Sequence, residues 1–338
     1  MSNPHGQRIT VGSATYVFQR DPTTGAAQCL GRGSFGAVYL VAQEDDPTAL
    51  YAAKILRPTV TAGAADNSDS APSVFRAQLE ANWTRMRGLD HPNLVRYLHA
   101  EMRPDTGQGV VILEYCPLGN LEQYLARCRR NPTHPAPSPA ALRGCTRDLL
   151  RGLHYLHTQR IIHTDLKPTN ILLTTSEGGR IVVKLADMDD HVGILASVTR
   201  SEIRATRGTV RYMSPEMFRL AGHHPGRERV GRKTDVWSAG VVVGEMTRGE
   251  RPLRFIKMDG ERPVPTDYLD VDANTPPFLI MDFVLNHGVP EVVDGVLGGF
   301  AGVLRRCFRW NGAERPTAEE LLRDPWLAEE HDVLLAWL

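Results

Sequence analysis

The chain has 338 residues, and its 39 lysine and arginine residues balance its 39 aspartate and glutamate residues, so the formal net charge is zero. Without an overall basic field the chain has no general attraction to nucleic acid or to an anionic membrane surface, and we expect neither as a partner. Hydrophobic residues (42%) and charged residues (23%) occur in ordinary globular proportions, which excludes wholesale disorder.

The first third of the chain is predicted to be mainly β-sheet with one helix. Residues 1–27 are polar and form an extension with one short strand candidate, and a flexible insert rich in Ala, Gly, Ser and Asp is expected at 57–73. Apolar and β-branched runs predict the strands, and a helical stripe of apolar residues predicts the helix. The strands are expected at 16–18, at 51–56, 94–98 and 110–115, and as a pair around a glycine-rich turn within 29–42; the helix is expected at 74–89.

After Pro117 the pattern becomes helical. Helices are expected at 121–130, 140–158, 236–246 and 318–323, and two short strands at 171–174 and 181–185. We therefore predict an α+β protein of two lobes, because a chain of this length exceeds the size at which single cores stop growing. The small lobe would cover about residues 28–115, the large lobe about 116–327, and residues 328–338 would form a tail.

Other features restrict the class of protein further. No apolar run is long enough to cross a bilayer, and the polar start MSNPHGQRIT lacks the apolar stretch of a secretory signal, so we expect a soluble, cytoplasmic protein. The five cysteines include no C-x₂-C pair, which gives a structural zinc site little support. His154, His157 and His163 could form a metal site, but core or surface histidines are the favoured interpretation.

The turn at residues 31–36 has the sequence G-x-G-x-x-G. A dinucleotide-binding fold would need a helix directly after this turn, whereas AVYLV predicts a strand; a phosphate-binding loop of the Walker type would need Gly-Lys-Ser/Thr, which is missing. A simple hairpin remains the alternative. Lys54 lies in the apolar strand YAAKI, where a buried ammonium requires an anionic partner.

Several motifs follow in one order along the chain. They are HTDLKPTN at 163–170, LADMD at 185–189, GTVRYMSPE at 208–216, DVWSAG at 235–240 and ERP at 314–316. Together with the glycine turn and the strand lysine, these motifs resemble the eukaryotic protein kinase family, over about residues 28–327. Lys167, Pro168 and the Gly-Thr at 208–209 are similar to the Ser/Thr-specific branch. The resemblance implies a two-lobed kinase fold and transfer of the γ-phosphoryl group of ATP to a protein hydroxyl with Mg²⁺.

The resemblance implies roles for five polar residues. Lys54 would hold the α- and β-phosphates, and Asn170 and Asp187 would offer oxygen ligands to Mg²⁺. Asp165 would orient the substrate hydroxyl and accept its proton, and Lys167 would neutralise the moving phosphoryl group. The residues expected to bind ATP are Leu30, Gly31, Gly33, Gly36, Val38, Ala52, Lys54, Glu114, Cys116 and Leu172, with Leu113 at the gatekeeper position. Glu216 and Arg315 match the ion pair of the family's large lobe.

The chain also departs from the family pattern. Thr164 replaces the arginine of His-Arg-Asp, and Asp187-Met188-Asp189 replaces Asp-Phe-Gly. An ungapped count places Asn82 where the family has the glutamate that pairs with the strand lysine; Glu80 is the nearest acid, about 200° away on a helix. We expect Asn82 to face Lys54. The favoured interpretation is an active Ser/Thr kinase that phosphorylates proteins; the alternative is a pseudokinase scaffold, and a non-kinase nucleotide enzyme is a distant third.

Overall fold

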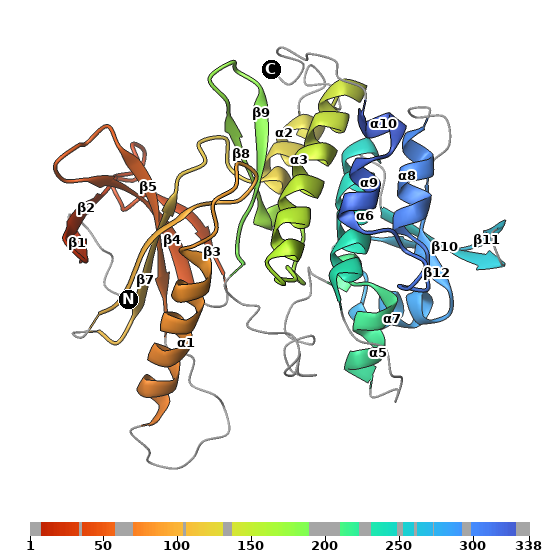
Figure 1. Ribbon diagram of the computed structural model, residues 1–338, viewed down its shortest axis with the longest axis horizontal. Coiled ribbons are helices and arrows are strands. Elements are labelled where there is room, and N and C mark those ends of the chain that lie inside the picture. The colour runs from red at the N-terminus through yellow and green to blue at the C-terminus, as the bar shows by residue number, and fades with distance from the viewer. Residues whose placement is uncertain are drawn as a thin grey trace. The chain divides into compact units, whose positions relative to one another are not determined.

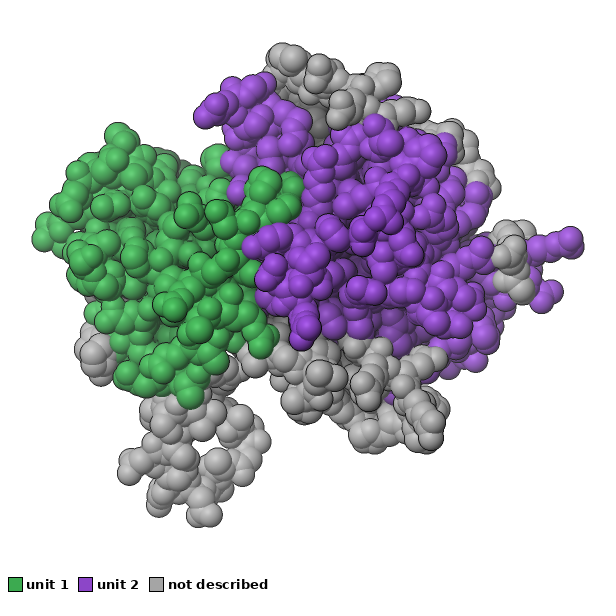
Figure 2. Space-filling view, in the orientation of Figure 1, with its two compact units in different colours: residues 1–117 green, residues 118–338 purple. Residues whose placement is uncertain are grey.

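The computed structural model describes residues 8–33, 36–57, 70–103, 106–130, 137–188, 210–222, 231–248, 253–259, 262–272, 274–292 and 299–328. The chain divides into two compact units, Met1–Pro117 and Leu118–Leu338 (Figures 1 and 2). The first unit is a β-sheet with one helix, and the second is mainly helical. The α+β fold expected from the sequence is therefore confirmed. In the described part of the chain, no helix combines the length and apolar content needed to cross a membrane.

The first unit contains one antiparallel sheet with the order β1-β2-β4-β5-β7-β6, and β3 pairs with β4 beside β2. Its elements are β1 (Arg8–Val11), β2 (Ala14–Phe18), β3 (Cys29–Arg32), β4 (Gly36–Gln43), β5 (Leu50–Leu56), α1 (Ser70–Met86), β6 (Tyr97–Met102) and β7 (Gly109–Glu114). The expected insert at 57–73 falls mostly outside the described residues, and its last residues begin α1.

In the first unit, helix α1 and strand β6 begin at other residues than the sequence predicts. Helix α1 begins at Ser70, a turn earlier than expected, because Pro72 is tolerated in the first turn of a helix. Strand β6 begins at Tyr97, whereas a strand was expected over 94–98. Leu94 and Val95 precede β6, and the Leu94 N–H donates to the His91 carbonyl at 3.0 Å. Both side chains are buried, which explains the apolar character of these two residues.

The N-terminal hairpin β1–β2 closes one face of the sheet. In β1, Ile9 and Val11 are buried while Thr10 between them is exposed, and in β2 Tyr16 and Phe18 are buried. These four side chains form one core cluster with apolar residues of the central strands, namely Val41, Ala53, Val110 and Ile112. The sequence predicted only a strand at 16–18, since the four residues RITV among polar neighbours are too short a signal.

The second unit is built around two long helices, α3 (Pro139–Thr158) and α6 (Arg232–Arg248), which pack on each other. Ser138 starts α3 as its N-cap by accepting the Ala141 N–H at 3.2 Å. The remaining elements are α2 (Leu121–Arg130), η1 (Pro168–Asn170), β8 (Ile171–Thr175), β9 (Ile181–Leu185), η2 (Val210–Tyr212), α5 (Pro215–Gly222), β10 (Leu253–Asp259), β11 (Arg262–Val271), α7 (Pro277–Leu285), β12 (Gly288–Pro290), α8 (Phe300–Cys307), α9 (Ala318–Leu322) and α10 (Pro325–Ala328).

A three-stranded sheet with the order β11-β10-β12 was not expected from the sequence. Two prolines, Pro263 and Pro265, lie in β11 and argue against a strand in the sheet interior. They are tolerated because β11 is an edge strand of this sheet. Arg254 on β10 holds β11 through two hydrogen bonds to the Asp270 carboxylate, at 2.6 and 3.0 Å.

We predict that residues 8–27 are required for the first unit to fold. Ile9, Val11 and Phe18 each bury an apolar side chain, at about 1.5–3 kcal/mol apiece. Their sum, about 5–9 kcal/mol, is comparable to the entire stability of a typical domain. A chain that starts at residue 28 should therefore aggregate or unfold well below the parent temperature in a thermal scan. A chain that lacks only residues 1–7 is the control, and equal melting of both truncated chains would contradict the prediction.

Candidate active site

The glycine turn joins β3 to β4, and its three glycines have different surroundings. A Cβ atom on Gly36 would lie 2.0 Å from the Ile55 carbonyl oxygen on the neighbouring strand β5. At Gly31 and Gly33, no atom of the described residues lies within 4 Å of such a Cβ. Gly36 is thus required by the close approach of two strands, whereas Gly31 and Gly33 leave open space beside the backbone.

Lys54 lies on the sheet face opposite the core that β1 and β2 close. Along β5, Ala53 points into that core, and its neighbours Ala52 and Lys54 point the other way. Val38 pairs with Lys54 across the β4–β5 ladder, and Leu113 pairs with Ala52 across β5 and β7. Lys54 is only 9% exposed. The first unit therefore gathers four of the expected side chains on one face: Val38, Ala52, Leu113 and Lys54.

The remaining expected residues of the first unit lie at the edges of this sheet. Leu30 is on β3, before the glycine turn. Glu114 is the last residue of β7, and its N–H donates to the Arg96 carbonyl at 3.0 Å. Cys116 follows and is buried. Leu172, which is also expected to bind ATP, lies on β8 in the second unit, where it forms an isolated β-bridge with Asn120.

Helix α1 turns Asn82, and not Glu80, toward the interior. Met86 is 2% exposed and Asn82 is half-buried, whereas Glu80 and Thr84 are exposed. Met86 lies one helical turn after Asn82, so the two share a face. These exposures support the ungapped register, and the contact of Asn82 with Lys54 stays a prediction.

Three of the expected polar residues meet in the loop before β8. The Lys167 ammonium donates to Asp165 Oδ2 at 2.6 Å. The Asn170 amide donates to the same oxygen at 3.0 Å and to the Asp165 carbonyl at 2.9 Å. The second carboxylate oxygen, Asp165 Oδ1, is buried and accepts no hydrogen bond from the described residues.

Asp187 lies beside Asn170 at the open end of the β8–β9 hairpin. The Ala186 N–H donates to the Asn170 carbonyl at 2.9 Å, one residue before Asp187. Asp187 adopts a left-handed backbone (φ 62°), which aspartate tolerates better than most residues. Met188, which stands in place of the phenylalanine of Asp-Phe-Gly, is buried. Asp189 lies outside the described residues.

The loop that carries Asp165 is held by Asp235, a fully buried residue of α6. Asp235 accepts the backbone N–H groups of His163 and Thr164, each at 2.8 Å, and the His157 ring donates to it at 2.8 Å. Burial alone would raise the pKa of Asp235, but the His157 hydrogen bond and the charges and N–H groups around it lower the pKa below its usual range. His157 and His163 are therefore parts of this network, a role that their spacing on the sequence did not reveal.

Thr164 shows that this network constrains the backbone. It adopts φ 59°, a conformation that is strained for a β-branched residue. The two N–H bonds to Asp235 hold it there. Strain of this kind persists only where the surrounding structure over-determines the conformation.

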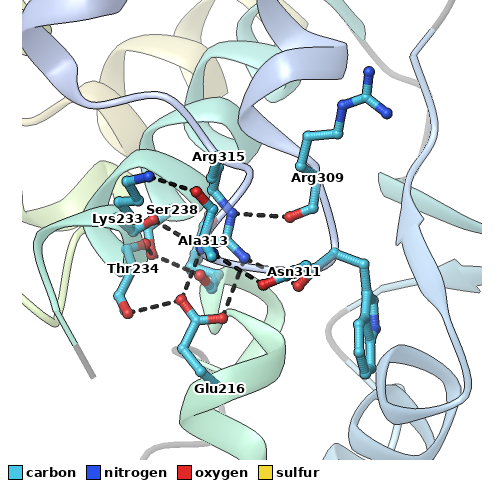
Figure 3. A network of polar contacts seen from close by, with 10 residues as sticks. Glu216, Lys233, Thr234, Ser238, Arg309, Asn311, Ala313 and Arg315 are labelled. Atoms are coloured by element: carbon cyan, nitrogen blue, oxygen red, sulfur yellow. Dashed lines mark hydrogen bonds and ion pairs between the residues drawn. The ribbon is translucent and has the colours of Figure 1, made fainter. Parts of the chain in front are cut away.

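The expected ion pair between Glu216 and Arg315 is confirmed (Figure 3). Arg315 is fully buried and donates to both carboxylate oxygens of Glu216, at 2.7 and 3.1 Å. It also donates to the carbonyls of Lys233 and Arg309, at 2.8 and 3.0 Å. Thr234 donates to Glu216 at 2.9 Å. Burial raises the pKa of Glu216, but the Arg315 hydrogen bonds and charge outweigh it, and the pKa lies below its usual range.

In a second glutamate, whose side chain is largely buried, the pKa shifts in the opposite direction. Glu245 on α6 accepts a hydrogen bond from the Tyr212 hydroxyl at 2.9 Å, while the Arg211 guanidinium is 3.9 Å away. Burial raises the pKa of Glu245 above its usual range, and these partners offset it only in part. The pKa of Tyr212 is also raised, mainly by burial and then by the Glu245 charge.

Comparison with known proteins agrees with this arrangement. The family model of the protein kinase domain matches residues 26–327. The chain therefore belongs to the protein kinase family, as the motifs indicated.

Its relatives include the mitogen-activated protein kinase kinase 7 of Arabidopsis thaliana, 32% identical over 302 residues that make up 89% of this chain and 83% of the relative. The mitogen-activated protein kinase kinase kinase ANP1 of Arabidopsis thaliana is 29% identical over 90% of this chain and 40% of its own length. The mitogen-activated protein kinase kinase kinase A of Dictyostelium discoideum is 29% identical over 90% of this chain and 28% of its own length. The chain thus spans less than half of these last two relatives.

We predict that Gly36→Ala destabilises the first unit and that Gly33→Ala does not. The methyl group that alanine adds at position 36 would collide with the Ile55 carbonyl oxygen, and overpacking of this kind costs about 1–3 kcal/mol. The Gly33 variant should remain within about 0.5 kcal/mol of the parent. Thermal unfolding of both variants measures the difference, and equal melting temperatures would show that the β4–β5 contact relaxes freely.

We also predict opposite pH dependences for two glutamine variants. The lowered pKa of Glu216 means that its ion pair stabilises the fold above the unfolded-state pKa and that this stability is lost as the pH falls through the folded-state pKa. Glu216→Gln should therefore be destabilised most at neutral pH, by about 3–5 kcal/mol, and less in acid. The raised pKa of Glu245 means that the parent loses stability as the pH rises. The stability of Glu245→Gln relative to the parent should therefore increase as the pH rises.

Denaturant unfolding of the two variants and the parent, between about pH 4 and pH 7, tests these signs. For each variant, the difference in unfolding free energy from the parent is followed with pH. If the two differences changed in the same direction, the electrostatic assignment of one glutamate would be wrong.

Proposed function

We propose that the protein is an active Ser/Thr protein kinase that transfers the γ-phosphoryl group of ATP to a protein hydroxyl. The observation that carries the proposal is the hydrogen bonding of Asp165. Lys167 and Asn170 both bind Oδ2, which leaves the buried Oδ1 without a donor among the described residues. A buried carboxylate oxygen without a donor is unfavourable, and a substrate hydroxyl supplies the missing hydrogen bond. Asp165 can then orient that hydroxyl and accept its proton.

The residues at the hairpin end are suited to Mg²⁺. Asn170 uses its amide nitrogen for Asp165, and its oxygen accepts only a long hydrogen bond from the Thr169 hydroxyl, at 3.4 Å, among those that the described residues give it. That oxygen would be the ligand atom, and Asp187 offers a carboxylate from the adjoining strand end. Carboxylate and amide oxygens are hard ligands of the kind that Mg²⁺ prefers. When bound, the metal neutralises charge on the phosphate oxygens of ATP. Lys167 would add positive charge near the transferred group, and Lys54 in the first unit would hold the other phosphates.

Two observations support a protein substrate. The motif residues Lys167 and Pro168 resemble the Ser/Thr branch, and the relatives are named as mitogen-activated protein kinase kinases and kinase kinase kinases. We therefore infer that the acceptor is a serine or threonine of a protein, with another protein kinase as the first substrate class to test. The pseudokinase alternative rests on Thr164 and Asn82, which replace residues that the family uses around Asp165 and Lys54.

Two asparagine variants should fail in different ways. Asp165→Asn removes the base and should lower the rate about 10²–10⁴-fold, with ATP binding largely retained, because Asp165 contacts the acceptor. Asp187→Asn removes a metal ligand and should abolish Mg²⁺-dependent ATP binding. Phosphoryl transfer from labelled ATP to a generic acceptor measures the first effect, and calorimetric titration with ATP measures the second.

Asp259→Asn, an exposed position on β10, is the matched control and should behave as the parent. If the Asp165 and Asp187 variants phosphorylate as well as the parent, the active-kinase proposal is wrong. If the folded parent transfers no phosphate, the pseudokinase alternative holds.

A further inference from the structure

The β8–β9 hairpin brings Asn170 and Asp187 together, but it cannot position them by itself. It is a sheet of two strands, and two-stranded sheets are marginally stable without other contacts. Asn170 directly precedes β8, and Asp187 follows β9 by two residues. The orientation of both side chains therefore depends on what holds the hairpin.

The outer edge of β9 is held by a buried carboxylate on α3. Asp148 is 2% exposed, and its Oδ2 accepts the Val183 N–H of β9 at 3.3 Å. Val183 is itself buried, and within the described ranges no strand other than β8 pairs with β9. A buried edge N–H needs a partner, and the Asp148 side chain supplies it in place of a further strand.

An arginine balances the charge of this carboxylate. The Arg180 guanidinium donates to Asp148 Oδ2 at 2.8 Å and to the Ile181 carbonyl at 3.3 Å. Arg180 lies where the hairpin turn enters β9, and its own carbonyl accepts the Ser176 N–H at 2.8 Å across the turn. The ion pair thus joins the turn end of the hairpin to α3, while the Val183 bond joins the middle of β9 to the same carboxylate oxygen.

We infer that Asp148 and Arg180 are positioning residues for the metal-binding end of the hairpin. This inference rests on the proposed function, since it assigns the pair a role in presenting Asn170 and Asp187 to Mg²⁺. Both residues bind each other and the backbone of β9, and they act through this strand, which leads to Asp187. Loss of Arg180 leaves the Asp148 carboxylate buried without its cation, and the hairpin must shift or the carboxylate must take up a proton. A shift of about 1 Å at a reacting group is enough to reduce activity strongly.

The test measures the Mg²⁺ dependence of ATP binding by calorimetry on the full chain, for the parent, Arg180→Ala, Arg180→Lys and Asp148→Asn. Arg180→Ala and Asp148→Asn should each raise the Mg²⁺ concentration for half-saturation about three- to tenfold. Arg180→Lys should recover part of this loss, because it keeps the charge. The double variant Arg180→Ala, Asp148→Asn should need no more Mg²⁺ for half-saturation than the more affected single variant, since both changes break the same interaction.

Arg254→Ala is the matched control. Arg254 forms an ion pair with Asp270 across β10 and β11, and both Arg180 (47%) and Arg254 (34%) have partly exposed side chains. It should leave the Mg²⁺ dependence within about twofold of the parent. A thermal scan of every variant separates a loss of stability from a change in metal affinity.

The outcomes are distinct. If Arg180→Ala binds Mg²⁺ and ATP as the parent does, whether or not its melting temperature falls, the pair is only structural and the inference is wrong. An equal shift in Arg254→Ala would also overturn it, because the effect would not depend on the hairpin. If the parent itself shows no Mg²⁺-dependent ATP binding, the proposed function fails, and the inference fails with it.

Discussion

The loop that carries the candidate catalytic residues depends on one buried carboxylate. Asp235 lies inside the second unit on α6 and accepts two consecutive backbone N–H groups, those of His163 and Thr164. These bonds hold Thr164 in a left-handed conformation that the residue would not adopt by itself. The backbone then enters Asp165 in one direction only, and Lys167 and Asn170 converge on its side chain. The helix provides rigidity, and the irregular loop carries the candidate catalytic residues.

The same solution recurs elsewhere in the second unit. Glu216 on α5 binds Arg315 from the segment before α9, and Asp148 on α3 binds Arg180 at the hairpin turn. In each case a carboxylate on a helix binds an arginine of a segment that lies outside the helices. Buried ion pairs of this kind contribute little net stability, because desolvation offsets their attraction. Their value here lies in selecting one arrangement of the segments that they join.

In the first unit, the core and the lysine proposed to bind ATP lie on opposite faces of one sheet. Successive residues of a strand point to opposite faces, so Ala53 packs in the core closed by β1 and β2 while Lys54 lies on the other face. Gly36 shows that packing and ligand binding can require the same residue. It belongs to the glycine turn, yet the close approach of Ile55 already excludes any side chain there. A glycine motif can therefore be required by packing as well as by a ligand.

Local patterns in the sequence were enough for the elements that end at clear signals. Helix α2 has the expected bounds, α3 begins one residue early at a proline behind its serine cap, and β9 matches its prediction. The motifs also single out Asp165, Lys167, Asn170 and Asp187, because kinase chemistry uses those residue types at that spacing. The strand β1 and the proline-containing edge strand β11 were missed, since short or interrupted runs carry no local periodicity.

What the sequence by itself determined is the inventory of reactive groups and most of the elements that carry them. What only the tertiary structure decided is which atoms make the hydrogen bonds that hold these groups in place. The partners of Asp235 lie 71, 72 and 78 residues away in the chain, and those of Asp148 lie 32 and 35 residues away. No spacing rule relates such positions, because their contact follows from how the helices and the hairpin pack, and a buried charge selects its partner only after that packing has removed water.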